Sequence, residues 1–447
     1  MANIQWAGPS EWNEWTEWLA TGLHGRNRWR LSILMSGALF AVGLRTVSSW
    51  LRAAGVTVDY EAYYYFLSSV GRNAHRVASQ LLLLVLRQGP LPERVLLVID
   101  DTPTKRYGPH VEGADIHHNP TPGPADQKYL YGHVWVTIAL AVRHPLWGAM
   151  ALPLQAMLYV RQRTLASIPP RRGWAFRTKL ELAVQLVREA TTALQQAGKR
   201  VWIVVDGAYA KKPFLKPVLA TRTVIISRLR KDAHLRSLPA PRKRNQPKRR
   251  GPWPTYGPDR ISLSKRAGQP RGWDTLTCTL YGKVTTKTFK TFLATYAPAG
   301  GTIRVVLVKE DTGWLALFCT SPEATAQEIL EAFADRATIE QDFHDQKEVW
   351  QTGKQQVRNI WTNVGVFNLN LWMQTLVELW AWHRPHDQLT DRSNSPWDDP
   401  DRRPSHANRR KALRLLFIRN EISAATAARH VTRQFHALVQ RLAQLAA

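Results

Sequence analysis

The chain has 447 residues and a formal net charge of +27, and such a field attracts polyanions, because each neutralised phosphate releases condensed counterions. Its 44% hydrophobic and 21% charged residues exclude a solvated basic tail and favour a folded nucleic-acid-binding protein over a membrane-surface or ribosomal one, with a central domain and appendages. Only two cysteines are present, which excludes a Cys-rich zinc module and a disulfide framework. The sequence shows no secretory signal and no apolar run near 20 residues, so we expect no membrane span. These features predict a cytoplasmic protein without a membrane partner.

The first 90 residues predict a helical N-terminal domain that binds DNA. Apolar residues recur at helical spacing from Trp29 to Val42. Two further helix-like runs, Thr46 to Ala54 and Tyr60 to Val70, are separated at Gly55. They fit a helix-turn-helix, and they fit equally a pair of packed core helices.

Residues 91–228 have the pattern of a sheet with helices. Nearly continuous apolar runs of six to fourteen residues predict strands that are buried on both faces. Three strands, a helix, a strand, a short helix and a last strand form the order of an α/β, RNase H-like mixed sheet that is flanked by helices. The expected strands are Arg94–Asp100, His133–Val142, Trp147–Val160, Val201–Asp206 and Thr223–Arg228, with the helix over about Lys179–Ala197.

A β-rich basic insertion is expected over residues 229–321, between that sheet and its last helix. Fourteen Lys or Arg and two acids lie from Arg228 to Arg271, and this stretch is either a disordered solvated loop or a contact that follows the DNA backbone. Antiparallel strands follow, with a hairpin turn at Thr312-Gly313. The residues of this region that we expect to bind DNA are Arg228, Arg230, Lys231, Trp253 and Trp273, the two Trp as platforms for base stacking.

The chain is expected to return to the RNase H-like core over residues 322–382. One helix is expected from near Pro322 past Lys347, followed by more helix to about Trp382. Residues 383–447 read as a linker and a basic helical tail, whose cations contact DNA or another subunit, or only keep the surface soluble. These cations are Arg409, Arg410, Lys411, Arg414 and Arg419.

Two acids stand at the ends of apolar strands, Asp101 and Asp206. One such Asp alone is more simply a strand-end cap, but two on adjacent strands would bring hard carboxylate oxygens together, which select Mg²⁺ or Mn²⁺. A third acid, Glu340, shares a helical face with Arg336 and Lys347. Because side chains alternate along a strand, only one of Asp100 and Asp101 can point into such a site, and alternation alone does not say which.

These residues resemble bacterial insertion-sequence transposases of the DDE class, in the branch whose third acid lies in a Tyr-x2-Arg-x3-Glu-x6-Lys motif. Phe333, Arg336, Glu340 and Lys347 match the spacing, with Phe333 in place of Tyr. Asp101 in IDDTPTK resembles the first Asp of the family, because a Thr follows it, and Asp206 in VVDGAY resembles the second. The insertion before the Glu is also a trait of this branch.

The resemblance implies a cut-and-paste DNA transposase, associated with the nucleoid, that uses two Mg²⁺ or Mn²⁺ ions. Asp101, Asp206 and Glu340 would be both catalytic residues and metal ligands, and Arg336 and Lys347 would hold DNA phosphates. The expected partners are double-stranded DNA, as terminal inverted repeats and target, and a second copy of the chain in a homodimer assembled on DNA. An RNase H-like nuclease without strand transfer and a catalytically retired DNA-binding protein are the alternatives.

Overall fold

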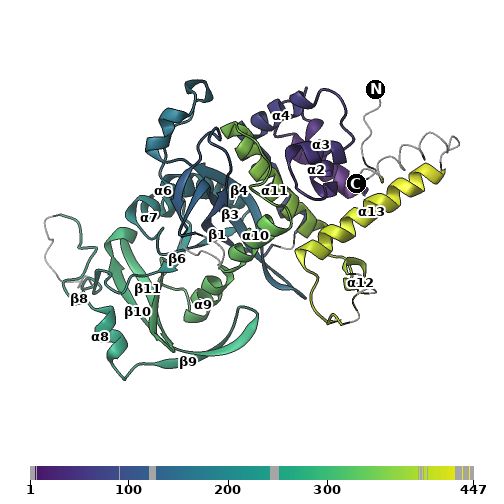
Figure 1. The fold of residues 1–447 in the computed structure, drawn as a ribbon. Coiled ribbons are helices and arrows are strands. Elements are labelled where there is room, and N and C mark those ends of the chain that lie inside the picture. The colour runs from purple at the N-terminus through teal and green to yellow at the C-terminus, as the bar shows by residue number, and fades with distance from the viewer. Residues whose placement is uncertain are drawn as a thin grey trace.

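The computed structural model describes most of the chain as an α/β fold (Figure 1). The described residues are 6, 8–89, 91–119, 127–241, 251–390, 392, 395, 397–399, 401–427, 435 and 442. Residues 242–250, the most basic part of the expected insertion, lie outside them, so both interpretations of that stretch stay open.

The N-terminal part is helical, as the sequence predicts. The two runs on either side of Gly55 both form helices, but they pack mainly on different partners, α3 on α2 and α4 on α11. They are therefore not the mutually packed pair that a helix-turn-helix requires. The helices are α1 (Ser10–Ala20), α2 (Arg30–Phe40), α3 (Val47–Ala53), α4 (Tyr60–Arg72) and α5 (Ala74–Gln88).

Two glycines bring α4 into backbone contact with α11 (Ile360–Ala381). A Cβ atom at Gly71 would lie 1.9 Å from the carbonyl oxygen of Trp361, and one at Gly365 would lie 2.1 Å from that of Leu67. Real Cβ atoms do not approach backbone so closely, so only glycine allows this crossing.

Five strands form the central sheet in the order β4-β3-β1-β5-β6. β1 pairs antiparallel with β3 and parallel with β5, and β5 pairs parallel with β6. This order and these directions are those of an RNase H-like fold, so the predicted fold class is confirmed. The strands are β1 (Arg94–Lys105), β3 (Tyr129–His144), β4 (Gly148–Tyr159), β5 (Arg200–Val205) and β6 (Val224–Arg228), with β2 (Asp115–His118) added to the start of β3.

The connections within this sheet are helical. The 3₁₀ turns η1 (Gln162–Ser167) and η2 (Pro170–Arg172) follow β4, and α6 (Lys179–Gln196) then begins at a capping box in which Thr178 and Glu181 exchange hydrogen bonds. The short helix α7 (Lys212–Leu219) joins β5 to β6.

The insertion extends the same sheet instead of forming a separate one. β12 pairs antiparallel with β6, and β11, β10 and β7 follow outward, so the described residues form a mixed sheet of twelve strands. Figure 1 shows β9 and β10 as a long curved hairpin. The elements are β7 (Leu235–Arg236), β8 (Arg260–Ile261), α8 (Leu263–Gly268), β9 (Asp274–Leu280), β10 (Lys283–Tyr296), η3 (Ala297–Ala299), β11 (Gly301–Glu310) and β12 (Gly313–Cys319).

The single helix expected from Pro322 past Lys347 is wrong. The chain forms two helices, α9 (Ala326–Asp335) and α10 (Thr338–Glu348). Between them the amides of Ala337 and Glu340 bond to carbonyls three residues earlier, which tightens the backbone into a 3₁₀-like turn at Arg336.

The C-terminal helix α13 (His406–Ala427) packs on the core of the fold, after the short α12 (His386–Leu389). Arg409 is 7% exposed and forms an ion pair with Glu378 of α11. Arg410 is 6% exposed, donates to the carbonyl of Leu39 and stacks on Trp350. The expectation that these two arginines are surface cations is therefore wrong, because they bind groups inside the fold.

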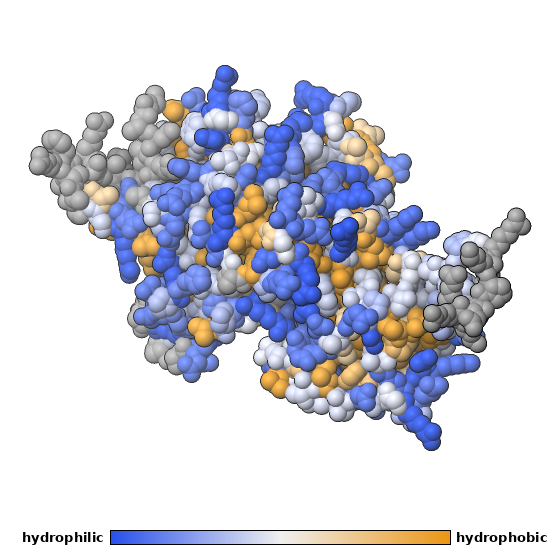
Figure 2. All heavy atoms as spheres, turned by 180° about the vertical axis from the view of Figure 1, so that it is seen from behind, coloured by the Kyte–Doolittle hydropathy of each residue, from blue (hydrophilic) through white to orange (hydrophobic). Residues whose placement is uncertain are grey.

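The two faces of the sheet bury separate sets of side chains. Leu97 and Ile99 of β1 belong to the larger apolar cluster, with α6 and α11, whereas Val98 packs with Ile339 and Phe343 of α10. Figure 2 shows the molecular surface from behind, where hydrophilic residues cover most of the surface and apolar residues are exposed in smaller groups. Within the described residues, no helix combines the length and the apolar character needed to cross a bilayer.

Candidate active site

Strand pairing brings an acid in the middle of β1 beside the acid that follows β5. The expected end of the first strand at Asp100 is wrong, because β1 continues to Lys105 by pairing with β3. Ile99 pairs with Val205, so the next residues, Asp100 and Asp206, are adjacent across the two parallel strands. The β5–β6 register continues in the same way to Arg228, because Val205 pairs with Ser227. The pairing of β1 with β5 stops at Ile99, so Asp100 lies at the carboxyl ends of β5 and β6, where ligands of open α/β sheets bind.

The side chain of Asp100 belongs to the face that α9 and α10 cover. It lies two residues after Val98, and residues two apart in a strand point the same way. Arg336 donates to Asp100 Oδ2 over 2.8 Å and to Glu340 Oε1 over 3.0 Å. One guanidinium, which also lies 5.9 Å from the centre of the Phe333 ring, therefore joins the strand acid to the helix acid.

Burial raises the pKa of Asp100 to about 6, against the opposing effect of Arg336. The neighbouring acids Asp101 and Asp206 raise this pKa further. An acid that is surrounded in this way is easier to ionise when a further cation is close.

Asp101 points to the opposite face, towards the start of α6. Lys179 Nζ lies 2.6 Å from Asp101 Oδ2, and the Tyr209 hydroxyl donates to Asp101 Oδ1 over 3.1 Å. Burial and the three acids Asp101, Asp100 and Asp206 hold the pKa of Tyr209 well above its usual value. Tyr209 therefore stays protonated and donates.

Asp206 lies directly after β5, beside Asp100 in the strand register. Its Oδ2 accepts the amide of Ala208 over 3.4 Å. Among the described residues, no three His, Cys, Asp or Glu side chains are gathered in a way that could hold a metal ion. The Glu340 side chain is turned to Arg336 and is 59% exposed.

The other residues that the sequence predicts to bind DNA are spread over α10 and the insertion. Lys347 is half-buried near the end of α10. Arg230 pairs with Asp232, and Lys231 lies 5.2 Å from the centre of the Trp314 ring.

The two candidate Trp differ in how far their rings are available. Trp253 is 39% exposed and donates its indole N–H to Ala240. Trp273 packs against the apolar core, and Lys290 Nζ lies 4.7 Å from its ring centre. Trp253 thus offers more free ring surface for stacking than Trp273.

Sequence reasoning missed Lys179 and Tyr209. Tyr209 lies three residues after Asp206 in the VVDGAY stretch, so the sequence itself indicates that the two residues are close in space. Lys179 begins a helix 78 residues after Asp101, and only the fold brings the two together.

Residues 19–293 match the model of a family described as DDE superfamily endonuclease. The matched range contains Asp100, Asp101 and Asp206 and ends before Glu340. A search of curated proteins found no match.

Proposed function

Because this chain belongs to the DDE superfamily endonuclease family, we propose that it is a DNA transposase that cleaves DNA at transposon ends and joins them to a target. The observation that carries the proposal is the Arg336 bridge between Asp100 and Glu340, beside Asp206. It joins an acid of β1 to the acid of α10, next to the acid that follows β5, and three such acids on separate elements are what the Tyr-x2-Arg-x3-Glu-x6-Lys resemblance implies.

The catalytic acids that we propose are Asp100, Asp206 and Glu340. The resemblance pointed to Asp101 as the first acid, through the Thr that follows it, but Asp101 is bound by Lys179 and Tyr209 on the other face of the strand. Asp100 instead shares Arg336 with Glu340. Asp101 would then act as a positioning residue that fixes Lys179.

The donor set fits a divalent metal, because three carboxylates offer the hard oxygen ligands that Mg²⁺ and Mn²⁺ prefer. Two such ions, when bound, would activate water or a 3′-hydroxyl and offset charge on the phosphate. Glu340 would join the two Asp by turning from Arg336, which its exposure allows.

The cations beside the acids would hold the DNA. Arg336, released from Glu340, can bind a phosphate oxygen in the bidentate manner of guanidinium groups. Lys347 on α10 and Arg228 beside Asp206 would bind phosphates on either side. Arg230, Lys231 and Trp253 of the insertion would contact the same duplex, in a homodimer that assembles on terminal inverted repeats.

A nicking assay on supercoiled plasmid that carries the terminal repeats tests the catalytic assignment. Glu340→Gln should abolish Mg²⁺-dependent nicking, whereas Glu348→Gln, an exposed acid at the end of the same helix, should not. If Glu340→Gln nicks as fast as wild type, the assignment of the third acid is wrong.

Joining separates the proposal from its first alternative. Strand-transfer products between repeat ends and a target plasmid are expected with wild-type protein. Nicking without any joined product would favour an RNase H-like nuclease, and binding without nicking would favour a catalytically retired DNA-binding protein.

A further inference from the structure

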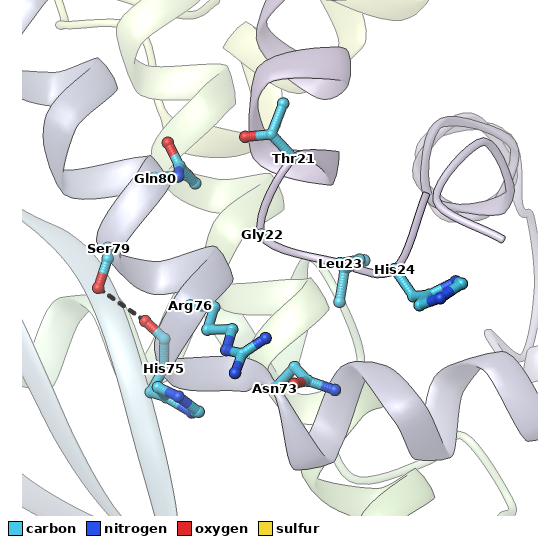
Figure 3. Close-up of a pocket in the computed structure, with 9 residues that line it drawn as sticks. All are labelled: Thr21, Gly22, Leu23, His24, Asn73, His75, Arg76, Ser79 and Gln80. Atoms are coloured by element: carbon cyan, nitrogen blue, oxygen red, sulfur yellow. Dashed lines mark hydrogen bonds between the residues drawn. The ribbon is translucent and has the colours of Figure 1, made fainter. Parts of the chain in front are cut away.

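A hollow of about 540 Å³ lies in the N-terminal helical part, away from the candidate active site. The loop after α1 forms one wall and the start of α5 forms the other (Figure 3). Residues 21–24 line the first wall, and Asn73, His75, Arg76, Ser79 and Gln80 line the second.

The lining is cationic and polar. It contains His24, His75 and Arg76, and none of the described lining residues is acidic. Arg26 and Arg28 follow in the same loop and are exposed. In the described part of the chain, the Arg76 guanidinium has no hydrogen bond or ion pair, and Figure 3 shows it extending between the loop and Asn73.

The fold builds this hollow through a close backbone approach. A Cβ atom at Gly22 would lie 3.0 Å from backbone atoms of Arg76 and Val77, so a larger residue here would push the loop away from α5 by a few tenths of an ångström. The indole N–H of Trp18 donates to the carbonyl of Gln80 over 2.9 Å, which fastens α1 to α5. His24 and Arg76 are therefore brought to the same hollow by fixed elements.

Further cations lie on the segment that leads to the start of α6, on the face of β1 opposite Asp100. Arg72, at the end of α4, donates to the carbonyl of Arg172 over 3.4 Å and stacks on Trp361 at 5.1 Å. Residues 171–179 carry the exposed Arg171 and the half-buried Arg177. This segment ends at Lys179, which lies beside Asp101. Arg72 thus joins the end of α4 to the basic segment that precedes α6.

We propose that the hollow binds a phosphodiester of the DNA duplex whose scissile phosphate lies at the catalytic acids. The duplex arm would run along residues 171–179 and reach Arg76 and His24. An unpaired guanidinium in a concave site whose described lining has no acid suits a phosphate, which accepts charge-assisted hydrogen bonds. His24 Nδ1 already accepts the Arg26 amide over 3.3 Å, so Arg76 is the principal ligand of this site. This inference rests on the proposed function, because it takes DNA as the substrate.

The proposal is tested by measuring equilibrium binding of a fluorescein-labelled DNA duplex in the presence of EDTA. The duplex has about 40 base pairs and is roughly 140 Å long, at about 3.4 Å per base pair. Arg76→Ala should weaken binding about fivefold to tenfold at low salt. It should also reduce the slope of log K against log salt by about 0.9, the value for one lost phosphate contact. Arg76→Lys should keep most of that slope.

Arg87→Ala is the matched control. Arg87 lies on the same helix, outside the hollow, where it stacks on Trp18 at 4.0 Å. If the salt slopes of Arg76→Ala and Arg87→Ala both equal that of wild type, the proposal is wrong. Thermal unfolding of Arg76→Ala should match wild type, because the side chain is exposed.

Inorganic phosphate distinguishes the two sources of the ligand. If Arg76→Ala abolishes stabilisation by inorganic phosphate but leaves duplex affinity and salt slope unchanged, the hollow binds free phosphate and the proposal is wrong. Because binding is measured in EDTA, its outcome is independent of nicking. A normal nicking rate in Glu340→Gln would contradict the catalytic assignment alone.

Discussion

Asp100 and Asp101 are neighbours in the chain, yet Asp100 is bound by Arg336 between α9 and α10, whereas Asp101 is bound by Lys179 of α6 and by Tyr209. The strand directs successive side chains to opposite faces, and each face is covered by different helices. The Asp100 face leads to an exposed second acid, Glu340. The difference shows that two adjacent acids of one strand have different partners because each points to a different set of helices.

The sharpest way to break this comparison is to neutralise each acid in turn. Asp100→Asn should reduce Mg²⁺-dependent nicking on the order of 10³-fold, because several kcal/mol of transition-state stabilisation are lost. Asp101→Asn should retain most of the activity. Rates of plasmid nicking at saturating Mg²⁺ measure both, and the opposite ranking would restore Asp101 as the first acid.

The pH dependence of stability tests the burial of Asp100. Its folded pKa of about 6 lies above the unfolded value of about 3.9, so the folded state binds the proton more tightly. The stability that this group contributes is fully present below about pH 4 and is lost as pH rises through about 6. Relative to wild type, Asp100→Asn should therefore gain up to about 3 kcal/mol between pH 4 and pH 7.

Urea unfolding in EDTA at several pH values measures this difference. Asp101→Asn is the matched control for loss of one carboxylate in the same strand. A constant difference between Asp100→Asn and wild type across this range would contradict the raised pKa.

Removing the cation from each face should give unequal losses of stability. Arg336 and Asp100 are 17% and 21% exposed, so Arg336→Ala leaves a largely buried acid without its cation and should cost about 1–3 kcal/mol. Lys179 is 38% exposed, so Lys179→Ala should cost about 0–1 kcal/mol. Equal losses in urea unfolding at pH 7 would show that the two faces are equally solvated.

The smallest effect is expected at the Tyr209 hydroxyl. Tyr209→Phe removes one hydrogen bond to Asp101 from a residue that is 2% exposed, which should cost about 1 kcal/mol of unfolding free energy. Nicking should change less than about twofold, since the hydroxyl belongs to the positioning face. A loss as large as that of Asp100→Asn would place Tyr209 in the chemistry.

The strands of the central sheet could be predicted because short, nearly continuous apolar runs, such as the one in β1, are typical of strands that are buried on both faces. Their order also followed from the sequence. The pairing of β12 with β6, which merges the insertion with this sheet, did not, because backbone hydrogen bonds leave no periodic trace in the side chains.

The sequence indicated which acids to consider but not the directions in which their side chains point. Asp206 and Glu340 stay predictions of the sequence. Alternation left Asp100 and Asp101 open, because it does not say which face of the strand is covered by which helix, and only the resemblance chose Asp101. The buried role of Arg409 was unpredictable for a similar reason. Its partner Glu378 lies on another helix, and helical periodicity carries no information about such a partner.

The glycine crossing of α4 and α11 limits how this molecule can be divided. Nearly every residue of α11 is buried, and the N-terminal helices share its apolar cluster. A fragment that begins at residue 91 would uncover a long apolar stripe on α11, and such surfaces promote aggregation. A catalytic fragment would therefore have to keep α4, and bulkier residues at Gly71 or Gly365 should mimic its loss without any truncation.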